Sequence, residues 1–276
     1  MASRSPPRHF DKYEGLGNDF IVIDVEDGAA LEVDRAVRLC DRRRGVGADG
    51  VLMLSPARSG AAAARMSVIN ADGSIPEMCG NGLRCVALHL ARRGGPRAFV
   101  VETDAGARAC SIEGISVGSD GSIESFVTVA MGRVVVGGHQ RVDVEGQPVD
   151  LWLASAGNPH AVLFGVSDRD SVNRLGPRIA THSAFPQGTN VGFATTHDGR
   201  VDLVVWERGV GLTLACGTGA CAAVAVGVER GLLPAGAPVD VSLPGGSLRV
   251  TRDPLSGETT LRGPARHVFR GELDGA

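Results

Sequence analysis

The chain of 276 residues is longer than one typical domain, which favours two domains of roughly 100–150 residues each. A hydrophobic share of 43% with only 4% aromatic residues predicts a globular protein whose core is built from aliphatic side chains. The net charge of -3 argues against nucleic acid or another polyanion as the partner. Residues 1–8 lack an apolar targeting region, and the longest apolar stretch, 216–228, is shorter than the ~20 residues that span a bilayer. We therefore expect a cytoplasmic protein without a membrane partner.

Taken in chain order, the apolar patterns predict many strands and few helices. Runs rich in Val, Ile and Leu with the length or alternation of strands occur at Phe20–Asp24, Gly50–Leu54, Arg65–Asn70, Phe99–Thr103, Phe126–Met131, Leu151–Ala154 and Val201–Trp206. Helical patterns occur at Asp34–Cys40, Asn81–Arg93 and Thr218–Arg230, and the last two stop at a glycine. A helix that is apolar on all sides is a buried one. The predicted fold class is α/β (α+β), with a curved, mostly antiparallel sheet wrapped around a central helix in each half.

The two halves of the chain repeat one pattern. Residues 78–94 and 215–231 align without a gap at an offset of 137, with five of the 17 positions identical. Two other landmarks recur in the same order 140 residues apart: Gly17-Asn18 with Gly157-Asn158, and Thr103–Gly106 with Leu243–Gly246. We infer an internal duplication that gives two pseudo-symmetric domains, expected at residues 1–122 plus about 264–276 and at residues 123–263.

Cys79 and Cys216 hold equivalent places in this repeat, because each opens a C-G-x-G motif in front of a predicted helix. A thiol at a helix N-terminus lies among backbone N–H groups that favour its thiolate, so we expect its pKa to fall toward neutrality. An acid and a base on opposite faces of one Cα–H centre are the minimum for inverting its configuration. Packing in the core or a structural disulfide is the alternative interpretation of these cysteines, and their matched setting argues against it.

The glycines and the other cysteines complete this interpretation. The backbone N–H groups of Gly80-Asn81-Gly82 and Gly217-Thr218-Gly219 are expected to form two anion-binding nests suited to a carboxylate. Cys40, Cys85 and Cys221 are assigned to the core, and Cys110 has no evident role. No C-x-x-C pair occurs and the histidines are scattered, so no metal site is expected.

The segment Gly45–Gly50 satisfies the G-x-G-x-x-G pattern of dinucleotide-binding loops. It follows a charged stretch, Asp41–Arg44, where such a loop follows an apolar strand. It also leads into a predicted strand where the dinucleotide motif opens a helix. We therefore reject a nucleotide-binding interpretation.

Several spaced motifs together resemble the diaminopimelate epimerase family over residues 10–270. They are Gly15–Phe20, Asn70–Ser74 with Glu77–Gly82, Gly157–His160, Thr189–Val191, and Glu207–Gly211 with Ala215–Gly219. The resemblance implies two pseudo-symmetric α/β domains, a homodimer, and no pyridoxal phosphate, metal or other cofactor. It also implies interconversion of LL- and meso-diaminopimelate in lysine and peptidoglycan precursor synthesis.

Carried over by position, Cys79 and Cys216 resemble the two catalytic bases, of which the first takes the proton from the LL substrate. The residues that resemble ligands of the distal amino-acid end are Asn18, Asn70, Asn158, Asn190 and Arg208. Gly80-Asn81 and Gly217-Thr218 resemble the nests for the reacting end, Glu207 the holder of the reacting ammonium, and His160 a group that tunes proton transfer. The chain departs from the family pattern at Leu212, often glutamate; at Gly188, frequently arginine or lysine; and at Gly50, glutamine in some members.

Two other functions fit parts of the same pattern. A proline or hydroxyproline racemase would share the scaffold and the pair of cysteines. The asparagine set and Glu207-Arg208 argue against it, because a cyclic amino acid has no distal ammonium and carboxylate to hold. A non-catalytic binding protein on the same scaffold is the second alternative, and it predicts no exchange of the substrate Cα hydrogen with solvent.

Overall fold

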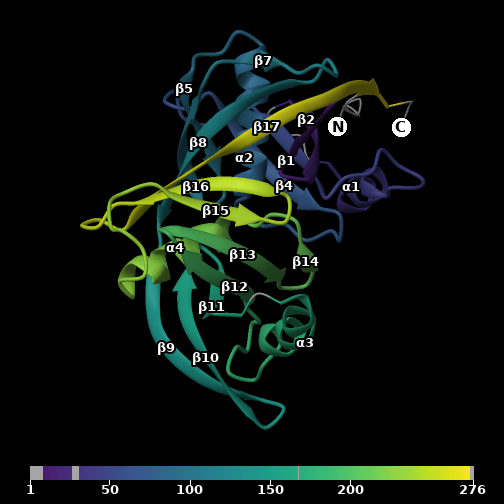
Figure 1. Cartoon of the computed structure of the whole chain (residues 1–276). Coiled ribbons are helices and arrows are strands. Elements are labelled where there is room, and N and C mark those ends of the chain that lie inside the picture. The colour runs from purple at the N-terminus through teal and green to yellow at the C-terminus, as the bar shows by residue number, and fades with distance from the viewer. Residues whose placement is uncertain (1–8, 27–30, 167, 274–276) are drawn as a thin grey trace. The chain divides into compact units, whose positions relative to one another are not determined.

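The computed structural model describes residues 9–26, 31–166 and 168–273 of a mixed α/β protein (Figure 1). Its chain divides into two compact units, one formed by residues up to 129 together with those from 263 onward, and one by residues 130–262. The first boundary lies inside strand β8 (Ile123–Arg133) and not at residue 122. It lies there because Val127 to Val129 of β8 pair with β6 (Gly106–Ile112) of the first unit.

The first unit contains two helices and a set of short strands. Its further elements are β1 (His9–Gly15), β2 (Asn18–Asp24), α1 (Val33–Cys40), β3 (Gly50–Ser55), β4 (Ala64–Asn70), α2 (Gly80–Arg92), β5 (Ala98–Thr103) and β7 (Ser116–Val117). The last part of strand β17 (Glu258–Glu272) joins this unit, because residues 266–272 pair antiparallel with β1.

The second unit has the same make-up of two helices among strands. Its elements are β9 (Val135–Val144), β10 (Gln147–Ser155), β11 (Pro159–Phe164), α3 (Arg169–Ala180), β12 (Asn190–His197), β13 (Arg200–Glu207), β14 (Gly211–Thr213), α4 (Gly217–Glu229), β15 (Val239–Leu243) and β16 (Gly246–Arg252). The first residues of β17 pair with β16 and belong to this unit.

The strand pairings repeat from one unit to the other, which confirms the duplicated fold. In the first unit β2 runs parallel to β3, β3 antiparallel to β4, β4 parallel to β5 and β5 antiparallel to β6. In the second unit the same alternation links β11, β12, β13, β15 and β16. The repeated turn motif also closes equivalent hairpins, since Thr103 pairs with Gly106 and Leu243 with Gly246.

The central helices are buried as the sequence predicts. Every residue of α2 from Gly80 to His89 is buried. Helix α4 is buried along almost its whole length and contacts strands β9 to β13 and β16 of its unit (Figure 1). The Ala- and Gly-rich sequence of α4 keeps this helix thin, so that strands pack closely on several sides of it. Both cysteine motifs are therefore fixed to a buried helix of their unit.

Helix α3 was not predicted from the sequence. Its twelve residues carry charges, a glycine and Pro177, a composition of low intrinsic helix propensity. The helix forms because the Asp168 side chain accepts a hydrogen bond from the Ser171 N–H at 2.8 Å, and because Val172, Leu175 and Ile179 are buried on one face. It stands where α1 stands in the first unit, between the two parallel strands.

Gly176 places α3 against Trp206 on β13, and this contact gives a test of the packing. A Cβ atom at Gly176 would lie 2.8 Å from Cγ of Trp206. Alanine normally stabilises a helix interior by about 1 kcal/mol over glycine. We expect Gly176→Ala instead to lower the free energy of unfolding by about 1–3 kcal/mol, because overpacking outweighs the helix preference. Urea denaturation measures this, with Gly60→Ala, whose Cβ meets open space, as the control. A more stable Gly176→Ala protein would contradict this packing.

Candidate active site

Each of the two motif cysteines caps the N-terminus of a central helix. Cys79 precedes α2 with φ −134° and ψ 111°, and its Sγ accepts a hydrogen bond from the Gly82 N–H at 3.3 Å. Cys216 precedes α4 with φ −128° and ψ 106°, and its Sγ accepts from the Gly219 N–H at 3.4 Å. The two sulfur atoms thus satisfy helix N–H groups that a Ser, Thr or Asp cap usually satisfies.

The second glycine of each C-G-x-G motif is required for space. A Cβ at Gly219 would lie 3.2 Å from Sγ of Cys216 and 3.0 Å from the side chain of Val205. A Cβ at Gly82 would lie 3.0 Å from Leu52 and 3.4 Å from Cβ of Cys79. Any larger residue would therefore push the capping sulfur away from the helix or the helix away from its sheet.

The two thiols differ in burial, and this corrects one expectation. Cys79 is partly exposed, whereas Cys216 is buried with 4% of its surface accessible. Burial raises the pKa of the Cys216 thiol well above its usual range, and the nearby Glu207 carboxylate acts in the same direction. The Thr218 hydroxyl and the Gly219 N–H oppose the shift without cancelling it. The expected fall of the thiol pKa at a helix N-terminus is thus wrong for Cys216, which is a neutral thiol at physiological pH.

Beside Cys79, two of the predicted asparagines form one hydrogen-bonded chain. The Asn81 amide on the first turn of α2 donates to Asn18 Oδ1 at the start of β2, at 3.0 Å. Asn18 Nδ2 donates to Asp49 Oδ2 at 2.7 Å. Arg84 Nη1 donates to Asn81 Oδ1 at 2.9 Å. The amide orientations of Asn18 and Asn81 are therefore fixed by their neighbours.

Asn70 lies at the end of β4 and has a different set of contacts. Its Nδ2 donates to Ser74 Oγ at 2.9 Å, inside the turn that follows the strand. Its backbone pairs with Gly50 on β3, and a Cβ at Gly50 would come within 3.6 Å of Asn70 Oδ1. The glycine at position 50, one of the three departures from the family pattern, thus leaves room beside this amide.

In the second unit, a chain of polar contacts runs to the sulfur of Cys216. The Thr218 hydroxyl lies 3.6 Å from Cys216 Sγ, and Asn158 Nδ2 donates to Thr218 Oγ1 at 3.4 Å. His160 Nε2 lies 3.0 Å from Asn158 Oδ1. Burial lowers the pKa of His160 to about 3, with a smaller contribution from the Arg208 charge. The ring is neutral at physiological pH, and because an amide oxygen can only accept, Nε2 is the nitrogen that carries the hydrogen and donates it to Asn158.

Asn190, Glu207 and Arg208 lie at the adjoining ends of β12 and β13. Asn190 Oδ1 accepts from the Arg208 backbone N–H at 3.0 Å, and its Nδ2 donates to the Pro159 carbonyl at 3.0 Å. Glu207 Oε1 accepts from the Thr213 hydroxyl at 2.7 Å. These bonds hold the backbone and carboxylate of the Glu-Arg pair in place.

The other departures from the family pattern have visible surroundings. Gly188 has φ +70°, a region that favours glycine, and a Cβ there would lie 2.9 Å from Cδ of Arg208. Arg208 Nη1 donates to the adjacent Gln187 carbonyl at 2.8 Å. The absence of a side chain at Gly188 therefore leaves room for the aliphatic part of the Arg208 side chain. Leu212 is an exposed residue of β14 paired with Trp206, and nothing in the structure explains its identity.

Comparison with known proteins identifies the family. The family model described as diaminopimelate epimerase matches residues 10–136 and 152–268. The chain belongs to the diaminopimelate epimerase family. It is 41% identical to the diaminopimelate epimerase of Desulfitobacterium hafniense over 95% of this chain and 96% of the relative, and 43% identical to that of Alkalilimnicola ehrlichii over 96% and 98%.

Solved structures of more distant proteins share the fold of this diaminopimelate epimerase family member. A probable proline racemase from Agrobacterium radiobacter matches with a TM-score of 0.75 at 17% identity, over 96% of this chain and 92% of that one. A predicted epimerase from Pseudomonas aeruginosa matches with a TM-score of 0.73 at 19% identity, over 98% and 100%. At these identities the likeness shows the fold alone.

Asp49, Arg84 and Thr213 touch the candidate residues, and the sequence interpretation missed all three. Asp49 lies in the Gly45–Gly50 segment that resembles a dinucleotide loop, and Arg84 lies in a helix whose pattern indicates core. A charged residue at an otherwise apolar helix position was the available signal for Arg84.

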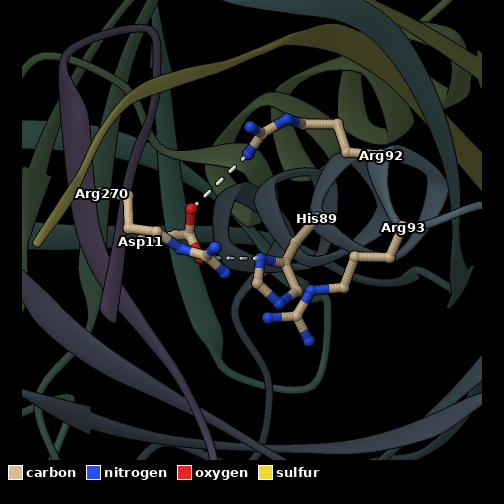
Figure 2. A pocket seen from close by; sticks show the side chains of 5 residues that line it. All are labelled: Asp11, His89, Arg92, Arg93 and Arg270. Carbon is tan, nitrogen blue, oxygen red and sulfur yellow. Dashed lines mark hydrogen bonds and ion pairs between the residues drawn. The ribbon is translucent and has the colours of Figure 1, made fainter. Parts of the chain in front are cut away.

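A polar pocket of about 200 Å³ lies near the C-terminal end of α2, the opposite end from Cys79 (Figure 2). The Asp11 carboxylate forms ion pairs there with Arg270 at 3.3 Å and with Arg92 at 3.6 Å. Arg93 forms an ion pair with Asp24 at 2.6 Å. Cations at a helix C-terminus compensate its partial negative charge. These contacts stabilise the end of α2 and do not belong to the cysteine site.

Among residues 9–26, 31–166 and 168–273, no group of three or more His, Cys, Asp or Glu side chains is arranged to hold a metal ion. Among the helices of the same ranges, none combines the length and the apolar character needed to cross a membrane.

The buried neutral His160 predicts a loss of stability in mild acid. Its pKa of about 3 lies below the 6.5 of an unfolded histidine, so between these values the unfolded chain binds the extra proton. The free energy of unfolding should therefore fall with decreasing pH below 6.5, by up to about 1.4 kcal/mol per pH unit from this group. Urea titrations at pH 6.5 and 5.0 should show a shallower fall in His160→Gln. His197→Gln, at an exposed site on β12, is the control, and an unchanged slope in His160→Gln would contradict the assignment.

Proposed function

We propose that this chain interconverts LL- and meso-diaminopimelate, with Cys79 and Cys216 as the acid and base that exchange a proton at one Cα. Relatives that carry the name diaminopimelate epimerase cover nearly the whole chain at about 40% identity. The observation that carries the proposal is the same cysteine-capped, glycine-spaced helix N-terminus in both copies of a duplicated unit. The reaction serves lysine and peptidoglycan precursor synthesis.

The proposed proton exchange needs only one thiolate and one thiol. Cys79 acts as thiolate and removes the Cα proton of the LL substrate, so that an S–H bond forms and the C–H electron pair stays on Cα. The Cys216 S–H then delivers its proton to the opposite face of Cα and becomes the thiolate. Burial favours this assignment, because it raises the pKa of Cys216, which therefore rests as the thiol. The reverse reaction runs with the roles exchanged.

The reacting end of the substrate would be held by the helix N-termini. We assign its carboxylate to the backbone N–H groups of Gly80 with Asn81 and of Gly217 with Thr218, where the partial positive charge of a helix favours an anion. Glu207, whose Oε1 is fixed by Thr213, would hold the reacting ammonium group. Hydrogen bonds to the carboxylate also stabilise the charge that develops when Cα loses its proton.

The distal end of the substrate would be held by side chains that bind both its charges. Amides offer donors and acceptors together, and arginine binds a carboxylate through two parallel hydrogen bonds. We assign this end to Asn18, Asn70, Asn158, Asn190 and Arg208. Proline has no distal ammonium or carboxylate, so this set separates the proposal from its alternative, a proline or hydroxyproline racemase. His160 is assigned the positioning of Asn158 and no proton transfer, because burial lowers its pKa to about 3 and so makes the ring a poor base.

Solvent deuterium exchange tests the proposed function. In D₂O the wild-type protein should place one deuterium at Cα while it converts LL- to meso-diaminopimelate, as mass spectrometry measures. Cys79→Ala and Cys216→Ala should each lower kcat for epimerisation by about a thousandfold, in the range of lost acid–base catalysis. Cys110→Ala, at a buried cysteine of β6 outside the motifs, is the matched control.

The outcomes separate three functions. Turnover of L-proline without turnover of diaminopimelate would favour the racemase. Binding of diaminopimelate with no deuterium at Cα, unchanged in Cys79→Ala, would favour a non-catalytic binding protein.

We also propose that the chain acts as a homodimer in the cytoplasm. The family resemblance supports the dimer, and the reducing cytoplasm would keep all six cysteines free, as they are in the structure. Light scattering at micromolar concentration should give twice the chain mass of 28.5 kDa. A fully active species of 28.5 kDa would contradict the dimer.

A further inference from the structure

We propose that Arg84 is a positioning residue that fixes the direction of the Asn81 and Asn18 amides beside Cys79. It goes beyond the proposed function and rests on it, because it concerns the side-chain orientation of Asn18, an assigned ligand, and of Asn81, whose backbone N–H is assigned to the substrate carboxylate. Arg84 lies on α2 and is 0% exposed, the largest of the fully buried side chains among residues 9–26, 31–166 and 168–273. The internal repeat does not predict a charged residue there, since the equivalent position of α4, 137 residues later, is occupied by Cys221.

Arg84 is held in a rigid setting by the backbone. Its Nε donates to the Pro264 carbonyl on β17 at 3.0 Å, which leaves Nη1 directed at Asn81 Oδ1 at 2.9 Å. Gly15 provides the room, because a Cβ at that position would lie 2.9 Å from Arg84 Nη2. Gly15 in turn pairs with Asn18 across the β1–β2 hairpin. The Arg84 guanidinium therefore approaches Asn81 from one fixed direction.

Arg84 and Asp49, at the two ends of this hydrogen-bonded chain, determine the orientation of the Asn81 and Asn18 amides. A guanidinium is a donor only, so Asn81 must present its oxygen to Arg84. Asp49, at the other end, accepts from Asn18 Nδ2 at 2.7 Å and is held by the Asp19 N–H at 3.0 Å and by Arg42 at 2.8 Å. A carboxylate is an acceptor only, so Asn18 must present its amide nitrogen to Asp49. With both ends fixed, neither amide can flip without losing two hydrogen bonds.

The second unit provides an internal comparison. Asn158 is equivalent to Asn18 in the repeat and Thr218 to Asn81, and these two also share a hydrogen bond. Its direction is reversed: Asn158 donates to the helix residue Thr218, whereas the helix residue Asn81 donates to Asn18. In the second unit Cys221 stands in place of Arg84, and a hydrogen-bond donor, His160, lies beside the loop residue Asn158. The direction of the contact thus follows the position of the terminal donor.

Such a fixed arrangement lowers the cost of binding, because the donors and acceptors are oriented before the substrate arrives. Arg84→Met keeps the length of the side chain and removes its donors. We expect kcat/KM for diaminopimelate to fall by about tenfold to a hundredfold, which corresponds to the loss of a charge-assisted hydrogen bond. Arg84→Lys should have an intermediate effect, since an ammonium lacks the planar fork that serves Asn81 and Pro264 together.

A double-mutant cycle separates positioning from general damage. If Arg84 acts through the amides, Arg84→Met should lower kcat/KM by less than about threefold in an Asn18→Ala background. Arg92→Met, on the same helix but bound to Tyr13 at the far end, is the matched control and should leave kcat/KM unchanged. Gly15→Ala provides a second route, because its Cβ displaces the guanidinium without removing it, and it too should lower kcat/KM.

The outcomes are distinct. Equal losses from Arg84→Met in the wild-type and Asn18→Ala backgrounds would overturn the positioning role while leaving the proposed function intact. Unchanged kcat/KM in both Arg84→Lys and Gly15→Ala would overturn it as well, even if Arg84→Met fails to fold. No epimerisation of diaminopimelate by the wild-type protein would instead mean that the proposed function has failed, and the inference with it.

Discussion

The N-terminus of a buried helix, capped by a thiol, is the constraint on which the rest of this structure depends. A buried helix end needs a partner for its first N–H groups, and in both units that partner is a cysteine sulfur. The residue three positions later is a glycine in both units: a Cβ at Gly219 would crowd the Cys216 sulfur, and a Cβ at Gly82 would crowd Leu52 beneath the helix. The chemistry and the fold therefore share the same atoms, and a change that frees the thiol from its cap also weakens the helix that positions it.

Duplication supplied the two caps, and divergence around them made them different. Asn81 corresponds to Thr218 and Asn70 to Glu207 at the offset of 137. A hydroxyl beside Cys216 and a carboxylate nearby act on the sulfur itself. Beside Cys79, the equivalent helix position carries an amide bound to Asn18 and Arg84. A single stereocentre presents two unlike faces, and two copies with unlike surroundings suit that requirement better than exact repeats would.

The sequence predicted the repeat, the buried helices and the place of both cysteines, because these depend on local patterns of apolar residues and glycines. It did not predict α3, whose composition disfavours a helix and whose stability comes from the Asp168 cap and contacts of Val172 and Leu175 with the core. The internal repeat could have predicted α3, since helix α1 stands at the same point of the first unit. The roles of Asp49 and Arg84 depend on contacts between residues distant in the sequence, which no local pattern records.

The raised pKa of Cys216 shows how magnitudes decide between opposing effects. A helix N-terminus stabilises a nearby anion by about 0.3–1 kcal/mol at exposed sites and by up to about 2 kcal/mol when partly buried. Full burial shifts an ionisable group by up to about 3–5 pKa units, and each unit is worth about 1.4 kcal/mol. Burial therefore prevails at Cys216, which is buried, whereas Cys79 keeps part of its surface accessible to water. After each conversion of the LL substrate under the proposed mechanism, Cys216 is left as a thiolate and Cys79 as a thiol. The pair is reset for the same direction of reaction when Cys79 releases its proton to solvent and Cys216 takes one up, and the raised pKa of Cys216 favours that uptake.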